Sequence, residues 1–299
     1  MNPPFRSTMA WLRLPAGPAF VLAAPMVVMG DIAPVDGDKS GYSLFHPTPP
    51  ALMREMSADR PDKTESPYTV DAGHFQMEID LVNYSYDRDT DGGRNTRTDD
   101  LFVAPMNLKL GLLNNVDLQV ILGTYNRVRE EDRTLGTTQT TSGFAGVATR
   151  LKINLWGNDG GRTAMGVMPF VIFPSGQEGL GIPEIEGGVI FPLAVELPHG
   201  WSLGMMTEFA MLNNETGNGR DATFINSITF GHGIWGKLSG YVEFFSQVSA
   251  GNNSGWIGTA DFGLTYRVTA NFLLDAGVNF GVTDRADNLN VFTGFTWRF

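Results

Sequence analysis

Residues 74–81 read HFQMEIDL, and this short stretch decides the fold class. Polar residues stand at the even positions from 74 to 80, and apolar residues stand at the odd positions from 75 to 81. Successive side chains of a β-strand point to opposite faces, so an alternation of period two predicts a strand with one polar and one apolar face.

The same alternation recurs along most of the chain as far as residue 299. It gives about twelve strands of roughly ten residues, an even number and a length that suits a strand crossing a bilayer at a tilt. We therefore predict an all-β fold, a transmembrane antiparallel up-and-down β-barrel of about twelve strands over residues 73–299. The pattern is weakest at 164–173, where both faces are apolar. The other predicted strands after the first are 102–110, 116–127, 147–155, 185–197, 201–211, 222–232, 238–248, 256–268, 272–282 and 289–299.

Charged residues are confined to one parity of these strands. A water-soluble sandwich or a lipocalin-like barrel would show the same alternation with the apolar face turned inward, so the pattern alone leaves both possibilities open. In a membrane barrel the charged parity lines the lumen. The predicted lumen-lining residues are Glu78, Asp80, Lys109, Asp117, Arg127, Arg150, Lys152, Glu186, Glu196, Glu208, Glu243, Asp261, Arg267, Asp275 and Arg298.

The lengths of the connections favour the membrane barrel. Short connections at 114–115, 157–161, 198–200, 231–236 and 269–270 alternate with mostly longer, more polar ones at 87–100, 129–142, 174–184, 213–220, 250–255 and 283–288. Outer-membrane barrels have short periplasmic turns and longer external loops, so both ends of the barrel are expected on the periplasmic side. Aromatic residues that favour membrane interfaces stand near the predicted strand ends: Trp156, Trp201, Trp235 and Trp297 at the periplasmic side, and Tyr84, Tyr86, Tyr125 and Trp256 at the outer side.

Composition and the N-terminal residues narrow the classes further. The absence of cysteine excludes disulfide scaffolds and thiol catalysis, and 21 Lys+Arg against 32 Asp+Glu argue against a nucleic-acid partner. Residues 1–30 carry two arginines before an apolar run, which predicts a cleaved secretory signal peptide, with a membrane anchor as the alternative. Residues 31–72 are rich in proline and charge and are expected to form an extended periplasmic segment, although 34–70 folding back as a plug is the other interpretation.

The chain ends FTGFTWRF at 292–299. This alternating strand with a terminal aromatic residue resembles the C-terminal signal by which outer-membrane barrels are recognised for insertion. Trp297 and Phe299 are the residues that would carry the signal, and the barrel-insertion machinery is the partner that it implies.

Residues 58–76 read ADRPDKTESPYTVDAGHFQ. This run resembles the entry segment of a bacterial family of outer-membrane proteins labelled "transporter" or "Putative MetA-pathway of phenol degradation", and the likeness extends over about residues 47–299. The resemblance implies an outer-membrane β-barrel of a Gram-negative bacterium with a role in uptake, including uptake of aromatic or other hydrophobic compounds. It assigns no binding residue.

Two short motifs resemble known sites, a hydrolase triad and a calcium-binding loop. Residues 200–204 read GWSLG, and Asp221 and His232 follow in the chain order of a hydrolase triad, but a nucleophile elbow needs a helix after the turn and Ser202 opens a strand. Residues 87–92 read DRDTDG, which copies the first half of a calcium loop through Asp87, Asp89 and Asp91. The twelfth position is Thr98 rather than glutamate, so a solvated acidic loop is the favoured interpretation. No cofactor is predicted.

The lumenal charges give the functional prediction. A barrel of about twelve strands lies between side-chain-filled small barrels and open porins, so its pore should be narrow. We expect passive uptake of a small-molecule solute with a mild preference for cations, because acids outnumber bases in the lumenal set. A plugged or structural barrel is the alternative, and a membrane-embedded hydrolase is a further one. The bilayer and its lipopolysaccharide are the expected surroundings.

Overall fold

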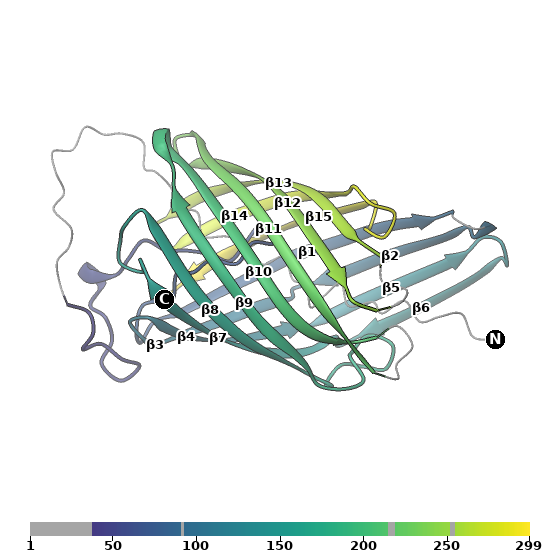
Figure 1. Ribbon diagram of the computed structural model, residues 1–299, viewed down its shortest axis with the longest axis horizontal. Helices are drawn as coiled ribbons and strands as arrows, with labels where there is room; N and C mark the ends of the chain where they lie inside the picture. The colour runs from purple at the N-terminus through teal and green to yellow at the C-terminus, as the bar shows by residue number, and fades with distance from the viewer. Residues whose placement is uncertain (1–37, 91–92, 215–218, 252–254) are drawn as a thin grey trace.

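The computed structural model describes residues 38–90, 93–214, 219–251 and 255–299, so the predicted signal peptide lies outside the described residues. The regular secondary structure of the described chain is almost entirely strand (Figure 1). The described residues include the short 3-10 helices η2 (Pro50–Leu52) and η4 (Pro198–Gly200). The strands are β1 (Phe75–Asp89), β2 (Thr96–Val103), β3 (Met106–Leu113), β4 (Val116–Gly123), β5 (Tyr125–Asp132), β6 (Thr137–Gly143), β7 (Gly146–Trp156), β8 (Thr163–Phe173), β9 (Glu186–Glu196), β10 (Trp201–Asn213), β11 (Arg220–Trp235), β12 (Leu238–Ser249), β13 (Ile257–Thr269), β14 (Phe272–Gly281) and β15 (Leu289–Arg298).

Twelve strands close into an antiparallel barrel, as the sequence predicts. The order around the barrel is β1, β3, β4 and then β7 to β15, and β15 pairs with β1 to complete the ring. The weakly patterned stretch at 164–173 is also a strand, β8, paired on both sides. None of the described helices has the length and hydropathy of a membrane-spanning helix.

The orientation of the faces excludes the water-soluble alternatives. Along β12, for example, Val242 and Phe244 are exposed while Glu243 between them is buried. The same arrangement, with apolar side chains outside and polar or charged ones inside, holds for most of the ring. A soluble barrel would have the opposite arrangement, so the outer surface is one that lipid covers.

The two ends of the barrel differ as expected from the sequence. The C-terminus and the purple N-terminal residues lie at one end of the barrel (Figure 1). The turns at that end are short, such as Asn114–Asn115 between β3 and β4, whereas the connection from β8 to β9 at the other end spans 174–185. We therefore assign the end with the C-terminus and the first described residues to the periplasm and the end with the long connections to the exterior.

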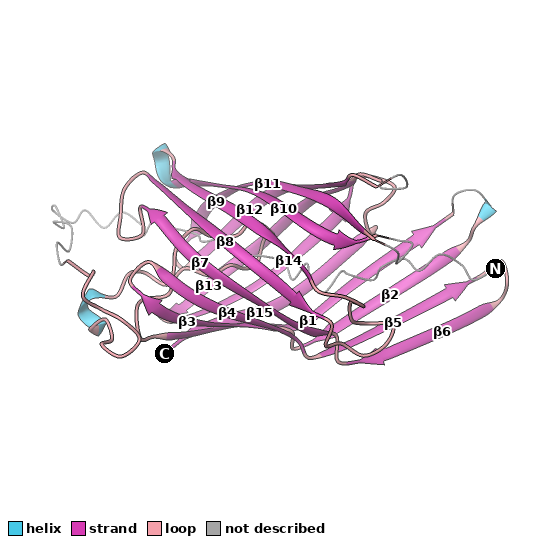
Figure 2. Ribbon diagram, turned by 60° about the horizontal axis from the view of Figure 1, so that its bottom comes forward, coloured by secondary structure: helices cyan, strands magenta, loops and turns pink. Residues whose placement is uncertain are grey.

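The barrel has an extension that the sequence did not predict. The outer part of β1 pairs with β2, β2 pairs with β5, and β5 pairs with β6, so the regions expected as external loops at 87–100 and 129–142 are largely strand. Figure 2 shows these strands projecting beyond the outer ends of the other strands. We call the residues from Val82 to Asp89 together with β2, β5 and β6 the outer flap.

The outer flap begins at a line of irregularities that crosses four strand paths at one level. β1 shifts register between Asp80 and Val82, and the other three paths break at 104–105, 124 and 144–145. Backbone hydrogen bonds still cross the line, including Ala145 N to Gly123 O at 2.8 Å and Asp80 N to Pro105 O at 3.1 Å. Irregularities of this kind bend a strand and change which side chains face inward.

Because of the line of irregularities, one residue that was predicted to face the lumen faces outward instead. Strict alternation from Asp117 and Gln119 would turn Arg127 inward, but the break at Thr124 inverts the parity. Asn126 and Val128 are buried instead, and Arg127 is exposed on the outward face of the outer flap. A one-residue slip exchanges the two faces of everything beyond it.

Candidate functional site

The barrel lumen is occupied by the chain's own N-terminal residues. Residues 54–71, here called the lumenal segment, form neither helix nor strand, and most of their polar side chains are buried. The contacts below place it inside the barrel, as the plug interpretation of residues 34–70 would have it, rather than in the periplasm. The reason is charge: its side chains find partners on the inner wall.

One wall of the lumen is basic and holds the acids of the lumenal segment. Asp59 forms ion pairs with Lys109 of β3 and Lys152 of β7, the latter at 2.6 Å. Glu65 forms an ion pair with Arg150, also on β7. Asp59 is 3% exposed and the side chains of the two lysines are 2% and 1% exposed, so these charges are fully removed from bulk water.

The opposite wall is acidic and holds the bases of the segment. The Arg60 guanidinium donates to both carboxylate oxygens of Asp275, at 2.9 and 2.6 Å, and pairs with Asp80 at 2.5 Å. The Lys63 ammonium lies 3.0 Å from Asp261 and 4.7 Å from the ring centroid of Phe245. The segment therefore connects two walls of opposite charge, with Asp59 and Glu65 on the basic wall and Arg60 and Lys63 on the acidic wall.

Hydrogen bonds supplement the ion pairs. The backbone N–H groups of Lys63 and Val70 donate to Glu243 at 2.9 Å and to Asp117 at 3.0 Å, and the Thr64 hydroxyl donates to Glu243 at 2.5 Å. Breaking a buried ion pair by removing one partner typically costs about 3–5 kcal/mol, because the other charge is left without compensation. The lumenal segment is thus held by several contacts that are each expensive to break.

A second set of ion pairs fixes the segment at the periplasmic mouth. Arg54 pairs with Asp71 at 3.3 Å, and Lys39 pairs with Asp159 of the β7–β8 turn at 2.7 Å. Partial burial acts to raise the pKa of Asp159, but the hydrogen bond from Lys39 and the charge of Arg54 outweigh it, so this pKa is lowered. We call the contacts of Lys39 and Arg54 with Asp159 the periplasmic latch.

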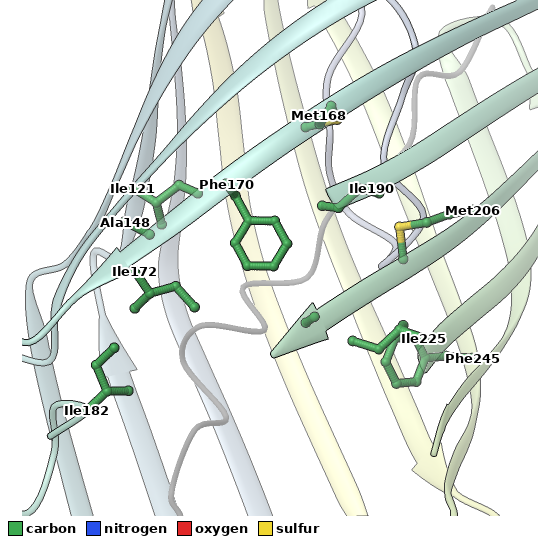
Figure 3. Packing of buried hydrophobic residues seen from close by; sticks show 11 residues of the cluster. Ile121, Ala148, Met168, Phe170, Ile172, Ile182, Ile190, Met206, Ile225 and Phe245 are labelled. Atoms are coloured by element: carbon green, nitrogen blue, oxygen red, sulfur yellow. The ribbon is translucent and has the colours of Figure 1, made fainter. Parts of the chain in front are cut away.

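Part of the lumen wall is apolar, which the predicted polar lining did not include. Met168, Phe170 and Ile172 point inward from β8 and form a buried cluster with residues of the neighbouring strands. Figure 3 shows their side chains gathered on one wall. The signal was present in the sequence, because β8 is the strand whose two faces are both apolar. The cluster also contains Ile121, Ala148, Ile182, Ile190, Met206, Ala210, Ile225 and Phe245.

The apolar wall adjoins the lumenal segment directly. The Met206 sulfur accepts a hydrogen bond from the Glu65 N–H at 3.5 Å, and Lys63 lies over Phe245. Gly188 lies opposite Phe170 on β9, and a Cβ added there would come within 2.9 Å of the Phe170 ring. The lumen therefore combines a charged, chain-filled part with an apolar surface beside it.

The remaining predicted lumenal residues occupy inward positions at different levels. Asp117 and Asp261 are fully buried, while Glu208 is half-buried beside the apolar cluster. Arg267 and Arg298 lie at the periplasmic mouth, where they pair with Glu55 at 3.1 Å and with Asp71 at 3.4 Å. At the ends of β9, Glu186 accepts a hydrogen bond from the Asn213 N–H at 2.7 Å and Glu196 is exposed. Glu78 accepts a hydrogen bond from the Asp59 N–H at 3.0 Å.

The hydrolase motif is not assembled. Ser202 pairs across the strands with Gly231, so it shares the inward face with that residue and His232 points to the other face. Asp221 pairs with Leu212 at the outer end of β11, far along the strand from His232. The three side chains do not form a triad.

The calcium motif also takes a different form from the one its spacing suggests. Asp87 and Asp89 lie in the extended strand β1, not in a loop that wraps an ion, and Asp91 is outside the described residues. Among the described residues no group of three or more histidine or acidic side chains is placed to hold a metal.

The predicted insertion signal lies at the closing seam of the barrel. The rings of Trp297 and Phe299 are 4.2 Å apart between centroids and both are exposed on the outer surface. The Phe299 N–H donates to Phe75 O at 2.8 Å, which joins the last residue to the first strand. Recognition of these residues by an insertion machinery stays a prediction.

Comparison with known proteins identifies the family. The family model described as "Putative MetA-pathway of phenol degradation" matches residues 58–299. The chain belongs to this family. The resemblance seen in residues 58–76 is confirmed, and the matched region includes most of the lumenal segment as well as the barrel. No curated protein matches.

Solved structures support the fold. The COG4313 outer membrane channel from Pseudomonas putida F1 is 10% identical, with a TM-score of 0.55 over 76% of this chain and 94% of that chain. The CymD monoaromatic hydrocarbon channel is 8% identical, with a TM-score of 0.43 over 75% and 87%. The NanC porin is 11% identical, with a TM-score of 0.46 over 73% and 98%. The protein is an outer-membrane β-barrel with the architecture of channels and porins.

Proposed function

We propose that this protein is a narrow channel for passive uptake of small hydrophobic solutes, aromatic compounds among them, and that the lumenal segment acts as its plug. The observation that carries the proposal is the apolar wall formed around Met168, Phe170 and Ile190 inside a barrel whose other lumenal side chains are charged. The interior of a membrane barrel is normally lined by polar side chains. Polar residues could fill this wall equally well, so the barrel structure alone does not require apolar ones here.

The description of the family supports the solute class, because it refers to phenol degradation. The CymD structure carries "monoaromatic hydrocarbon channel" in its description, which is consistent with the same class for this chain. Phenolic solutes are flat, mostly apolar and uncharged at neutral pH, so the apolar wall offers them a surface that water and ions do not use.

The plug makes the passage selective. The segment occupies the charged part of the lumen and is held there by its ion pairs. A solute therefore passes along the apolar wall, or it passes only after the segment has been displaced. A large open pore like that of a sixteen-stranded porin is not expected, and polar solutes of sugar size should be excluded.

The test is uptake into proteoliposomes containing the mature chain, with phenol and a sugar such as arabinose compared side by side. Phenol influx should exceed that of protein-free liposomes, and arabinose influx should not. Phe170→Gln should lower the phenol flux about tenfold, since it places a polar amide in the apolar wall, and Phe170→Leu serves as the apolar control.

Two results would overturn the proposal. If the wild-type barrel passes neither solute although it is folded, the structural-barrel alternative is favoured. If Phe170→Gln and Phe170→Leu have the same phenol flux, the apolar wall does not carry the solute.

A further inference from the structure

The outer flap has two faces of opposite charge. The strand register places Arg88 directly beside Arg97, and it places Leu101 beside Arg127 and Asp99 beside Arg129. These residues share the outward face, which continues the outer surface of the barrel. Four arginines therefore stand on this face, with only two acids, Asp99 and Glu131.

The inward face of the outer flap has the opposite character. Its charged residues are all acidic, and no lysine or arginine occupies an inward position in β2, β5, β6 or the outer part of β1. The acids on this face are Asp87, Asp89, Asp100, Glu130 and Asp132. In a chain with a net charge of −11, the concentration of arginines on one face is a local feature and not a consequence of composition.

The basic face is continuous with the lipid-covered belt. Val82, Val103 and Tyr125 form the lowest row of the outer flap and are exposed. The next row contains Tyr84, Leu101 and Arg127, and the rows beyond it contain the other three arginines. Along one continuous surface the side chains thus change from apolar to aromatic to cationic, which is the order found from the hydrocarbon to the headgroups of a membrane.

Two of the arginines are not neutralised by an acidic side chain among the described residues. Arg88 and Arg127 form no ion pair with any residue in the described part of the chain, and Arg127 is exposed. Arg129 lies 3.8 Å from Asp99 and 3.6 Å from Glu131, which are loose contacts, while Arg97 pairs with Asp99 at 2.7 Å and lies 5.2 Å from the ring centroid of Tyr86. Strands are about 4.8 Å apart and alternate residues about 7 Å apart, so neighbouring guanidinium groups can reach one phosphate together.

We propose that the outward face of the outer flap binds the phosphate groups of lipopolysaccharide in the outer leaflet through Arg88, Arg97, Arg127 and Arg129. Arginine suits this ligand because its planar guanidinium donates two parallel hydrogen bonds to a phosphate. The membrane depth suits it too, because the arginines begin where the lipid-facing apolar rows end. A soluble partner would not require that continuity with the belt.

Binding would be measured with the full mature chain in phosphatidylcholine nanodiscs containing bisphosphorylated lipid A, fully dephosphorylated lipid A, or neither. The matched variants are the fourfold change R88Q, R97Q, R127Q and R129Q, and the control R220Q. Arg220 is also at the outer rim but is paired with Glu184 at 3.8 Å and belongs to β11, outside the outer flap.

The wild type and R220Q should bind bisphosphorylated lipid A at least about tenfold more tightly than the fourfold variant, and dephosphorylated lipid A should bind weakly to all three. Equal affinity of the wild type and the fourfold variant would overturn the proposal. Equal affinity of the wild type for the two lipids would also overturn it, since the phosphates would then contribute nothing.

Two controls keep the test decisive. If free inorganic phosphate at the lipid A concentration displaces the lipid, the site is a simple anion site and the lipid proposal fails. If the fourfold variant does not fold, R127Q alone replaces it, because this side chain is exposed and forms no ion pair with a described residue. Transport of solutes is not read in this experiment, so its result is independent of the proposed function.

Discussion

The lumen and the outer flap both concentrate charge, but they use it in opposite ways. In the lumen most charges of the segment are buried, and several of them meet opposite charges on the wall, as Asp59 does with Lys109 and Lys152. On the outward face of the outer flap Arg88 and Arg127 are exposed, and they have no ion-pair partner among the described residues. Burial therefore makes lumenal charges structural, whereas exposure leaves the flap charges available to another molecule.

The largest expected effect tests the buried side of this comparison. Asp59→Asn should weaken the attachment of the lumenal segment by about 3–5 kcal/mol, because Lys109 and Lys152 lose their shared carboxylate in a buried site. In planar bilayers the variant should open to larger conductance steps than the wild type.

Restoring charge balance provides the control for that variant. Adding Lys152→Met to Asp59→Asn removes one acid and one base, while Lys109 keeps its ion pair with Glu78, so this double variant should recover much of the attachment. Equal conductance of the wild type and Asp59→Asn would mean that the ion pairs do not hold the segment.

A steric change should have a smaller effect on the same attachment. Gly111 faces the segment backbone, and a Cβ at this position would lie 2.0 Å from Asp71 O. Gly111→Ala should displace the segment at a cost of about 1–3 kcal/mol, and trypsin should then cut after Arg54 or Lys63 faster than in the wild type. Gly41→Ala is the matched control, since its Cβ would meet nothing within 4 Å, and equal cutting of the two variants would contradict the prediction.

The periplasmic latch predicts a weak dependence on pH. The lowered pKa of Asp159 means that its contribution is present above the unfolded pKa and is lost as the pH falls through the folded pKa. Because this carboxylate is partly exposed, the contribution should be no more than about 1 kcal/mol. The hydrogen-exchange protection factors of residues 38–57, which are corrected for the intrinsic pH dependence of exchange, should fall on acidification below about pH 4, and Asp159→Asn should show the lower protection already at neutral pH.

The smallest effect on stability is expected for the exposed ion pairs of the outer flap. Arg133 pairs with Glu131 at 3.2 Å at the tip of the outer flap, where both side chains are open to solvent. Arg133→Ala should change the free energy of unfolding by less than about 1 kcal/mol, measured by urea unfolding of the refolded barrel. A loss comparable to that of Asp59→Asn would show that exposure does not separate the two regions.

The barrel strands were predictable from the sequence because their alternation is a local property. The outer flap was not, since the charged residues at 87–100 and 129–142 have the composition of loops although they pair as strands. The inward facing of Arg127 was a wrong prediction for a related reason, because one extra residue at Thr124 reverses the faces and leaves no mark in composition.

The lumenal site was predictable only in part. The walls could be listed because parity separates Lys109, Lys152 and Asp275 from the lipid-facing residues. Their partners Asp59 and Arg60 lie in a segment without period, and the distance along the chain between Arg60 and Asp275 leaves no local signal of their contact. The apolar wall had one visible sign, the two apolar faces of β8.

The line of irregularities at the base of the outer flap has a consequence for how this family's sequences can change. Each of the four strand paths shifts by one residue at the same level, so the faces of the outer flap stay in phase with one another. Deleting a single residue from one path, for example Thr124, would turn the arginines of β5 inward against the acids while its neighbours kept their faces. The four shifts therefore depend on one another. Insertions or deletions at this level should be tolerated only when all four strands change together.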